Sequence, residues 1–250
     1  MSDALHNPCA TCGACCRSYI VPVCGYDVWL ISTQQRLGPE QFLVPCPQEP
    51  PRADGFLLDR EDPPYGLALD KRGQFHPNQP CVFLMDLKGG NSRCGIYEHR
   101  PVVCQAYPMT AIGTVVAQFD DALCPPGSWP PAAVARPAWR EAIARRIMHY
   151  AIYEDVVSRW NARVIAAPPG AQFSLYAFYD YLMNAYDRLD MLNQELGAET
   201  LADIQDTWGM VGEEDSERTA AESNAPNPNW LVYRDQIRWL LAGFYAESAT

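Results

Sequence analysis

Four cysteines stand close together near the start of the chain, at Cys9, Cys12, Cys15 and Cys16, in the pattern C-x2-C-x2-C-C. Two intervening residues let the backbone turn so that both sulfurs of a C-x2-C pair reach one ion, and thiolates bind zinc and iron–sulfur clusters. Adjacent cysteines rarely point at one tetrahedral ion. Cys15 and Cys16 are therefore expected to serve different metals, or different atoms of one cluster.

All 10 cysteines precede residue 125, and further members of the set lie in short motifs with Pro, Gly or aromatic neighbours. A disulfide scaffold is the weaker interpretation, because the N-terminal sequence lacks an export signal and thiols stay reduced inside cells. Eight thiols suit two four-thiolate sites or one polynuclear cluster. The expected metal ligands are Cys9, Cys12, Cys15, Cys16, Cys81, Cys94, Cys104 and Cys124.

These motifs resemble the CxxCxxCC family of zinc- or iron-chelating proteins, also called YkgJ-type. The resemblance covers residues 9 to about 125, and it implies a metal-binding cluster of the same eight cysteines. Distant relatives of this family methylate lysine side chains of flagellin, but nothing in residues 125–250 supports the same activity for this chain. Cys24 and Cys46 fall outside the pattern and are expected to be small buried hydrophobic residues. The matching segments are Cys9-x2-Cys12-x2-Cys15-Cys16, Pro80-Cys81-x-Phe83-Leu84 and Cys94-x-Ile96-Tyr97-x2-Arg100-Pro101-x2-Cys104-x2-Tyr107-Pro108.

Tyr97 and Arg100 flank the cysteines and are the expected cofactor-binding residues. Arg100 could offset the negative charge of a polythiolate site, or hold a loop by bidentate hydrogen bonds, and this supporting role is favoured over catalysis. His6 and His99 also lie near cysteines in the sequence. Either could replace a thiolate, although solvent exposure is the favoured interpretation for both.

The elements that must position these residues are short in the first half of the chain. A helix is predicted from Asp27 as N-cap to Leu37, with Gly38 as its stop, and Pro101 is expected to start a helical turn that delivers Cys104. One more helical turn is expected at residues 39–43. Short strands are predicted at residues 56–58, 67–69, 82–85 and 114–119.

In the second half of the chain, apolar residues recur at the spacing of an α-helix. One helix is predicted from Pro137 to about Ala166, where Pro168-Pro169-Gly170 stops it, and another from Ser174 to about Leu196. Shorter helical stretches at 201–208 and 230–245 flank an acidic linker at about 212–229. The expected fold class is α+β, with an irregular cysteine-rich metal-binding half at residues 1–125, made of short strands and helices, and a mainly helical half at 126–250.

The composition and the missing motifs exclude several further classes of function. The 250 residues are 48% hydrophobic and carry a net charge of −11, with a pI of about 4.7, which argues against a duplex nucleic-acid binder. No apolar run reaches the ~18 residues of a membrane span. Zinc-protease, phosphate-loop, dinucleotide-turn and nucleophile-elbow motifs are missing from the sequence. A soluble, cytoplasmic protein without nucleic-acid or membrane partners is expected.

The sequence therefore predicts a cytosolic metal-binding protein whose partners are metal ions. The cofactor is iron, as an iron–sulfur cluster or iron ions, and/or zinc. A C-x2-C-x2-C opening suits an iron–sulfur cluster, whereas four-thiolate tetrahedral sites suit zinc. The adjacent pair Cys15 and Cys16 and the count of eight thiols slightly favour iron, with zinc at a second site. Two alternatives remain open: a metal-cluster-dependent enzyme that modifies a peptide or protein side chain by methyl transfer or redox chemistry, and a metal storage or delivery protein.

Overall fold

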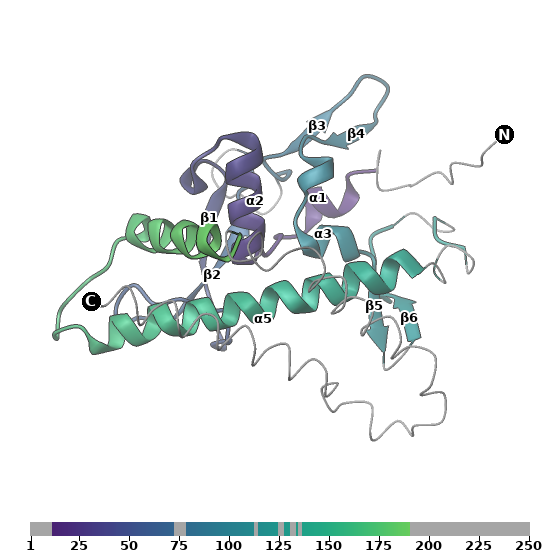
Figure 1. Cartoon of the computed structure of the whole chain (residues 1–250). Coiled ribbons are helices and arrows are strands. Elements are labelled where there is room, and N and C mark those ends of the chain that lie inside the picture. The colour runs from purple at the N-terminus through teal and green to yellow at the C-terminus, as the bar shows by residue number, and fades with distance from the viewer. Residues whose placement is uncertain are drawn as a thin grey trace, which may run out of the picture.

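The computed structural model describes residues 12–72, 79–112, 115–124, 128–130, 134 and 137–190. Within them the chain has an α+β fold, as predicted, in which short strand pairs lie among helices (Figure 1). The elements are α1 (Ala14–Ser18), α2 (Gly25–Gln35), η2 (Pro39–Gln41), β1 (Leu43–Pro47), β2 (Tyr65–Leu69), β3 (Leu84–Asp86), β4 (Ser92–Cys94), η3 (Tyr97–His99), α3 (Val102–Ala106), β5 (Met109–Ile112), β6 (Val115–Gln118) and α5 (Pro137–Ala166).

The strands of the described residues form three antiparallel pairs, β1–β2, β3–β4 and β5–β6. The predicted strand at 67–69 is confirmed within β2, the one at 114–119 is confirmed over the four residues of β6, and the one at 82–85 is shifted to Leu84–Asp86. The prediction at 56–58 is wrong, because Phe56 makes only a single bridge, to Tyr65. β1 was not predicted, since two of its five residues are prolines.

α2 begins earlier than the sequence indicated. Cys24 is its N-cap, and Asp27 is its third residue, not the cap. The Asp27 carboxylate reaches back to accept the backbone N–H of Cys24 at 3.0 Å, which satisfies a donor that the helix itself cannot. The helix also ends earlier, because Arg36, and not Gly38, adopts the left-handed conformation, with φ 56°.

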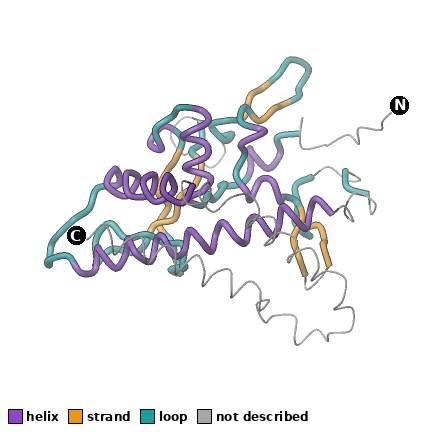
Figure 2. Tube along the Cα trace, viewed as in Figure 1, coloured by secondary structure: helices purple, strands orange, loops and turns teal. Residues whose placement is uncertain are grey.

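α5 is the longest element, with 30 residues, and runs along much of the described fold (Figures 1 and 2). Its bounds confirm the prediction from Pro137 and from the Pro-Pro-Gly stop. The next helix is described over residues 175–190, and the hydroxyl of Ser174 accepts the N–H of Ala177 at 3.1 Å as its cap. The predicted end of this helix and the segments predicted at 201–208, 212–229 and 230–245 lie outside the described residues.

One hydrophobic core joins the two halves of the chain. Phe56 stacks on Phe178 with ring centroids 3.9 Å apart, and Trp160 of α5 packs edge-on against Phe178. Trp160 also donates its indole N–H to the carbonyl of Leu57 at 2.6 Å. Beside it, the Asn161 side chain accepts the N–H of Leu57, at 2.8 Å. The long helix is therefore fixed to the first half by both packing and hydrogen bonds.

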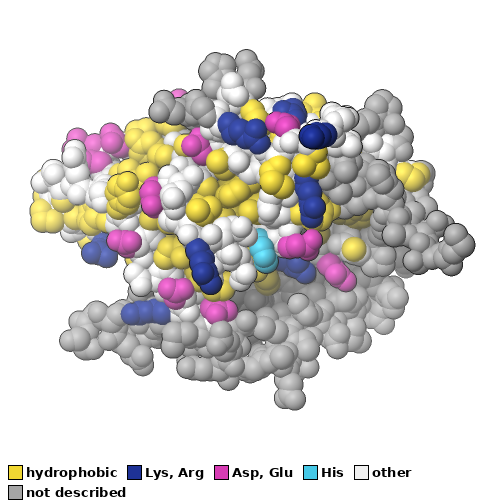
Figure 3. Space-filling model, turned by 90° about the horizontal axis from the view of Figure 1, so that it is seen from above, with side chains coloured by type: hydrophobic (Ala, Val, Ile, Leu, Met, Phe, Trp, Pro, Cys, Tyr) yellow, Lys and Arg dark blue, Asp and Glu magenta, His cyan; other side chains and the backbone are white. Residues whose placement is uncertain are grey.

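The described surface is mixed in character. On the face drawn in Figure 3, hydrophobic side chains alternate with basic and acidic ones. In the part of the chain that the structure describes, no helix combines the length and the apolar character needed to span a bilayer.

Candidate metal centre

The turn before α1 sets the direction of the first cysteines. Gly13 lies between Cys12 and the helix with φ 67°, and a Cβ at this position would meet the Cβ of Ser92 at 2.9 Å. Both the left-handed backbone and the close approach require glycine. At the other end of α1, Arg17 pairs with Asp86 and donates to the Ser92 hydroxyl at 2.7 Å. This short helix is thereby held against the β3–β4 hairpin.

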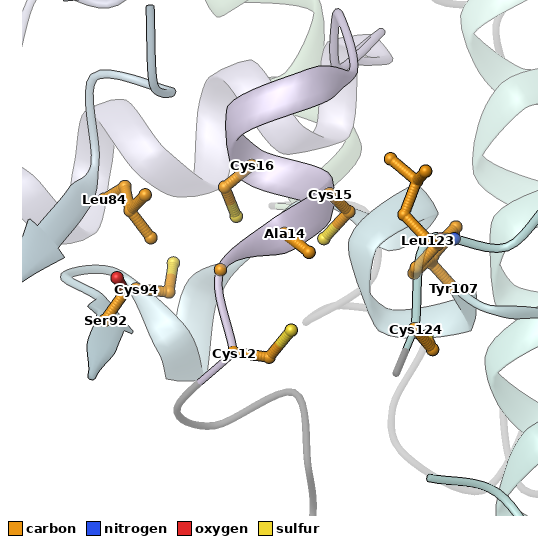
Figure 4. A pocket seen from close by; sticks show the side chains of 11 residues that line it. Cys12, Ala14, Cys15, Cys16, Leu84, Ser92, Cys94, Tyr107, Leu123 and Cys124 are labelled. Atoms are coloured by element: carbon orange, nitrogen blue, oxygen red, sulfur yellow. The ribbon is translucent and has the colours of Figure 1, made fainter. Parts of the chain in front are cut away.

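A small cavity of about 40 Å³ lies beside α1, and five of its eleven lining residues are cysteines. Figure 4 shows the sulfurs of Cys12, Cys15, Cys16 and Cys94 pointing into the space between these residues, with Cys124 on the opposite side. Cys15 and Cys16 come from α1, Cys94 ends β4, and Cys124 follows the β5–β6 hairpin. Three separate segments thus bring thiols to one place.

A second cavity of about 360 Å³ shares three of these cysteines, Cys15, Cys16 and Cys94, and adds Cys81 and Cys104. All seven expected ligands within the described residues therefore line one of the two cavities, or both. Cys9 lies outside the described residues. The two cysteines outside the pattern lie elsewhere: Cys24 is buried beside Asp27, and Cys46 lies on β1.

Backbone hydrogen bonds fix Cys81 beside α1. The carbonyl oxygen of Cys16 accepts the N–H of Cys81 at 2.8 Å and the ammonium group of Lys71 at 3.1 Å. Lys71 is only 2% exposed. A buried ammonium group therefore lies next to two of the cysteines.

Cys104 is delivered by α3, which follows Pro101 as the sequence predicted. The start of this helix is held by Asp27, whose second carboxylate oxygen accepts the N–H of Val102 at 2.9 Å. One buried carboxylate therefore caps the beginnings of both α2 and α3. This arrangement links the position of Cys104 to the core helix α2.

The thiols of the site differ in acidity. A hydrogen bond from the Cys16 thiol, assisted by the charge of Arg100, lowers the pKa of Cys15 to about 7. The same contact and burial raise the pKa of Cys16 above its usual value. Burial raises the pKa of Cys81 to about 11, and it also raises the pKa of Cys94, although the charge of Arg100 acts in the opposite direction there. The site therefore mixes one acidic thiol with several protonated ones.

Arg100 and Tyr97 lie together at the larger cavity. The guanidinium carbon of Arg100 sits 4.3 Å from the centre of the Tyr97 ring, a cation–π distance. The described histidines, His99 and His149, line neither cavity. His149 instead stacks on Tyr26, with ring centroids 3.8 Å apart.

The donor set has the chemistry that zinc and iron require, since both metals bind thiolates. Within the described residues, however, no group of three or more Cys, His, Asp or Glu side chains is arranged to hold a metal ion. The thiols are gathered around shared cavities but do not form a finished coordination shell.

Comparison with known families agrees with this donor set. Residues 8–125 match the family model CxxCxxCC, described as a "putative zinc- or iron-chelating domain". Residues 8–125 belong to the CxxCxxCC family. No curated protein and no solved structure matches the chain. The CxxCxxCC domain ends at the residue after Cys124, so it contains every cysteine of the chain.

Sequence reasoning missed two residues that support the site, Lys71 and Asp27. Lys71 lies in a Pro-, Gly- and Asp-rich stretch and reaches Cys16 across 55 residues. Asp27 reaches Val102 across 75 residues. Contacts over such separations leave no local signal in the sequence, so only the folded chain reveals them.

Proposed function

We propose that the CxxCxxCC domain binds iron or zinc through cysteine thiolates. The supporting observation is that the seven described members of the predicted set line two adjoining cavities, while Cys24 and Cys46 line neither. Cys9 would complete the set of eight. The proposed ligands are Cys9, Cys12, Cys15, Cys16, Cys81, Cys94, Cys104 and Cys124.

An iron–sulfur cluster is the form of the metal that we favour, with zinc at a second site as the variant. The C-x2-C-x2-C opening and the adjacent pair Cys15 and Cys16 support this choice, because neighbouring thiolates can serve different atoms of a cluster. When bound, iron would supply redox chemistry, and zinc would supply a cross-link that stabilises the fold.

Thiolate ligands carry negative charge, and two cationic residues of the chain would stabilise that charge. Arg100 and Lys71 supply positive charge beside the thiols, which favours the thiolate form of Cys15 and Cys81 respectively. Apolar side chains around Cys81 keep water away, which strengthens these electrostatic interactions. The reducing cytoplasm is the compartment that we propose, because free thiols persist there.

A metal-dependent enzyme is the second candidate, and the larger cavity favours it. A structural four-thiolate site is closed around its metal, whereas here five cysteines border about 360 Å³ of mostly apolar space. Such a space could admit a peptide or protein side chain for methyl transfer or redox chemistry. Storage or delivery is less favoured, because Cys81 is buried and exchange requires accessible thiolates.

The deciding experiment is elemental analysis with a visible absorption spectrum on the full chain, purified without oxygen. Iron with acid-labile sulfide and a broad visible band would identify an iron–sulfur protein. A colourless protein with bound zinc would indicate a structural site. A chain that holds neither metal, even after incubation with ferrous iron and sulfide or with zinc, would refute the proposal.

A further inference from the structure

The larger cavity has the size of a ligand pocket as well as a wall of cysteines. Its volume of about 360 Å³ lies within the ~300–1,000 Å³ typical of small-molecule sites. Apart from the cysteines, its lining is largely apolar and aromatic, and Ile20, one of the lining residues, is 49% exposed. A metal site held by the five cysteines would take the part of the space beside the sulfurs. The remainder is available to an organic ligand.

Two tyrosines give this cavity a fixed aromatic wall. Tyr19 and Tyr107 pack edge to face, with ring centroids 5.7 Å apart. The hydroxyl of Tyr19 donates to the carbonyl of Asp121 at 3.0 Å, and the hydroxyl of Tyr107 accepts the N–H of Leu123 at 2.7 Å. Because a backbone group engages each hydroxyl, both tyrosine side chains are held in place in the cavity lining. Aromatic or aliphatic groups suit such a surface.

Arg100 supplies the cavity with a positive charge. Its guanidinium is held over the Tyr97 ring, and no carboxylate in the described ranges forms an ion pair with it. Lys71 is a second cation beside the cysteines, so Arg100 is not the sole counter-charge for thiolates. The acidic residue in the lining, Asp121, is exposed. A guanidinium has five donors and matches a carboxylate in a bidentate manner.

We propose that this cavity binds a small organic carboxylate, whose apolar or aromatic body lies between the tyrosine wall and the cysteines and whose carboxylate pairs with Arg100. The inference rests on the proposed function in one respect, because the bound molecule would lie beside the thiolate-held metal. The cavity, the aromatic wall and the charge of Arg100 are independent of that metal.

The test uses the full chain purified without oxygen, with metal content measured on every sample. Phenylacetate, indole-3-acetate and hexanoate are the probes, each compared with its uncharged amide by calorimetry. At least one acid is expected to bind about tenfold more tightly than its amide, the usual scale of one charge-assisted hydrogen bond. Failure of all three acids to bind metal-loaded protein at about 10 mM, or equal binding of acids and amides, would overturn the proposal.

Matched variants locate the binding site. Arg100→Gln should abolish the preference for the acid. Arg146→Gln removes the same charge from a neighbouring depression outside the cavity, and this variant should retain the preference. Equal effects of the two substitutions would contradict the proposed site. A chain that takes up neither iron nor zinc but still prefers acids would refute the metal proposal alone, and a metal-loaded chain that binds no acid would refute this inference alone.

If Arg100→Gln loses its metal, a second pair of variants still tests whether the acid binds in this cavity. Ile20→Glu places a negative charge at the edge of the cavity and should weaken acid binding several-fold. Ile112→Glu makes the same change at a residue of β5 that is 68% exposed and outside the cavity lining, and it should have no effect. Undiminished acid binding in Ile20→Glu would count against the cavity.

Discussion

The ammonium group of Lys71 donates a hydrogen bond to the carbonyl oxygen of Cys16, over a distance of 3.1 Å. The same carbonyl accepts the N–H of Cys81. Burying an ammonium group costs free energy unless charge or hydrogen bonds compensate it. Thiolates at Cys16 and Cys81 would provide that compensation. The buried lysine is therefore best suited to the metal-bound, deprotonated form of the site.

Lys71→Met should weaken metal binding more than it weakens the fold. The lost hydrogen bond is offset by the removed cost of burying the charge, so the free energy of unfolding of the metal-free chain should change by less than about 1 kcal/mol. Metal affinity, measured by competition with a chelator, should fall by about tenfold, because the thiolates lose a counter-charge. Lys88→Met, at an exposed lysine, is the control. Equal affinities in both variants would contradict this role.

Substitution of individual cysteines should divide them into two groups. Cys12→Ser and Cys104→Ser should lose metal and destabilise the first half, because metal-binding free energy is also folding free energy. Cys46→Ser, on β1 and away from both cavities, should retain its full metal content. Elemental analysis of the three purified variants checks this prediction. The ligand assignment fails if all three lose metal equally.

Metal binding should release protons. Burial raises the pKa of Cys81 to about 11 and that of Cys94 above its usual value, so both thiols carry protons at pH 7 in the metal-free chain. Each thiol that becomes a ligand must lose its proton, and affinity should rise up to about tenfold per pH unit for each proton displaced. Calorimetric titration in buffers of different ionisation enthalpy counts these protons. A count of zero would be incompatible with thiolate ligation by these residues.

Asp27 should give the fold a measurable pH dependence. Burial raises the pKa of this carboxyl from 3.8 to about 6 in the folded chain. The folded state therefore binds the proton more tightly, and this stabilisation is complete below pH 4 and is lost as the pH rises through 6. The shift corresponds to about 3 kcal/mol.

Comparison with Asp27→Asn isolates this effect, because the amide keeps an acceptor oxygen but does not titrate. The stability of the wild-type chain relative to the variant should increase by up to about 3 kcal/mol from pH 7 to pH 4. Urea unfolding at several pH values measures the difference. If that difference stays constant over the whole range, Asp27 has an ordinary pKa.

The sequence predicted best the elements whose signals are local. Pro137 and the Pro-Pro-Gly stop defined α5, and Ser174 defined the start of the next helix. The start of α2 was missed because a cysteine is an unusual N-cap and Asp27 acts from the third helical position. β1 was missed because Pro45 and Pro47 suggest a loop, although prolines are tolerated in a strand at the edge of a sheet.

The sequence indicated which cysteines would lie together better than it indicated how they would be arranged. The family resemblance, which rests on short cysteine motifs, set eight expected ligands apart from Cys24 and Cys46, and the seven that the structure describes line the two cavities. Their role as ligands stays a prediction. The side-by-side placement of Cys81 and Cys16 depends on a hydrogen bond between segments 65 residues apart, which no short motif encodes. The contributions of Lys71 and Asp27 have the same long-range origin.

The core shared by the two halves has a consequence for biosynthesis. The cysteine-bearing half leaves the ribosome first, but Trp160 and Phe178, which complete its core against Phe56, follow the last cysteine by dozens of residues. At elongation rates of about 5–20 residues per second, the thiols wait several seconds in a nascent chain whose hydrophobic core is still incomplete. During that interval they are open both to metal delivery and to oxidation.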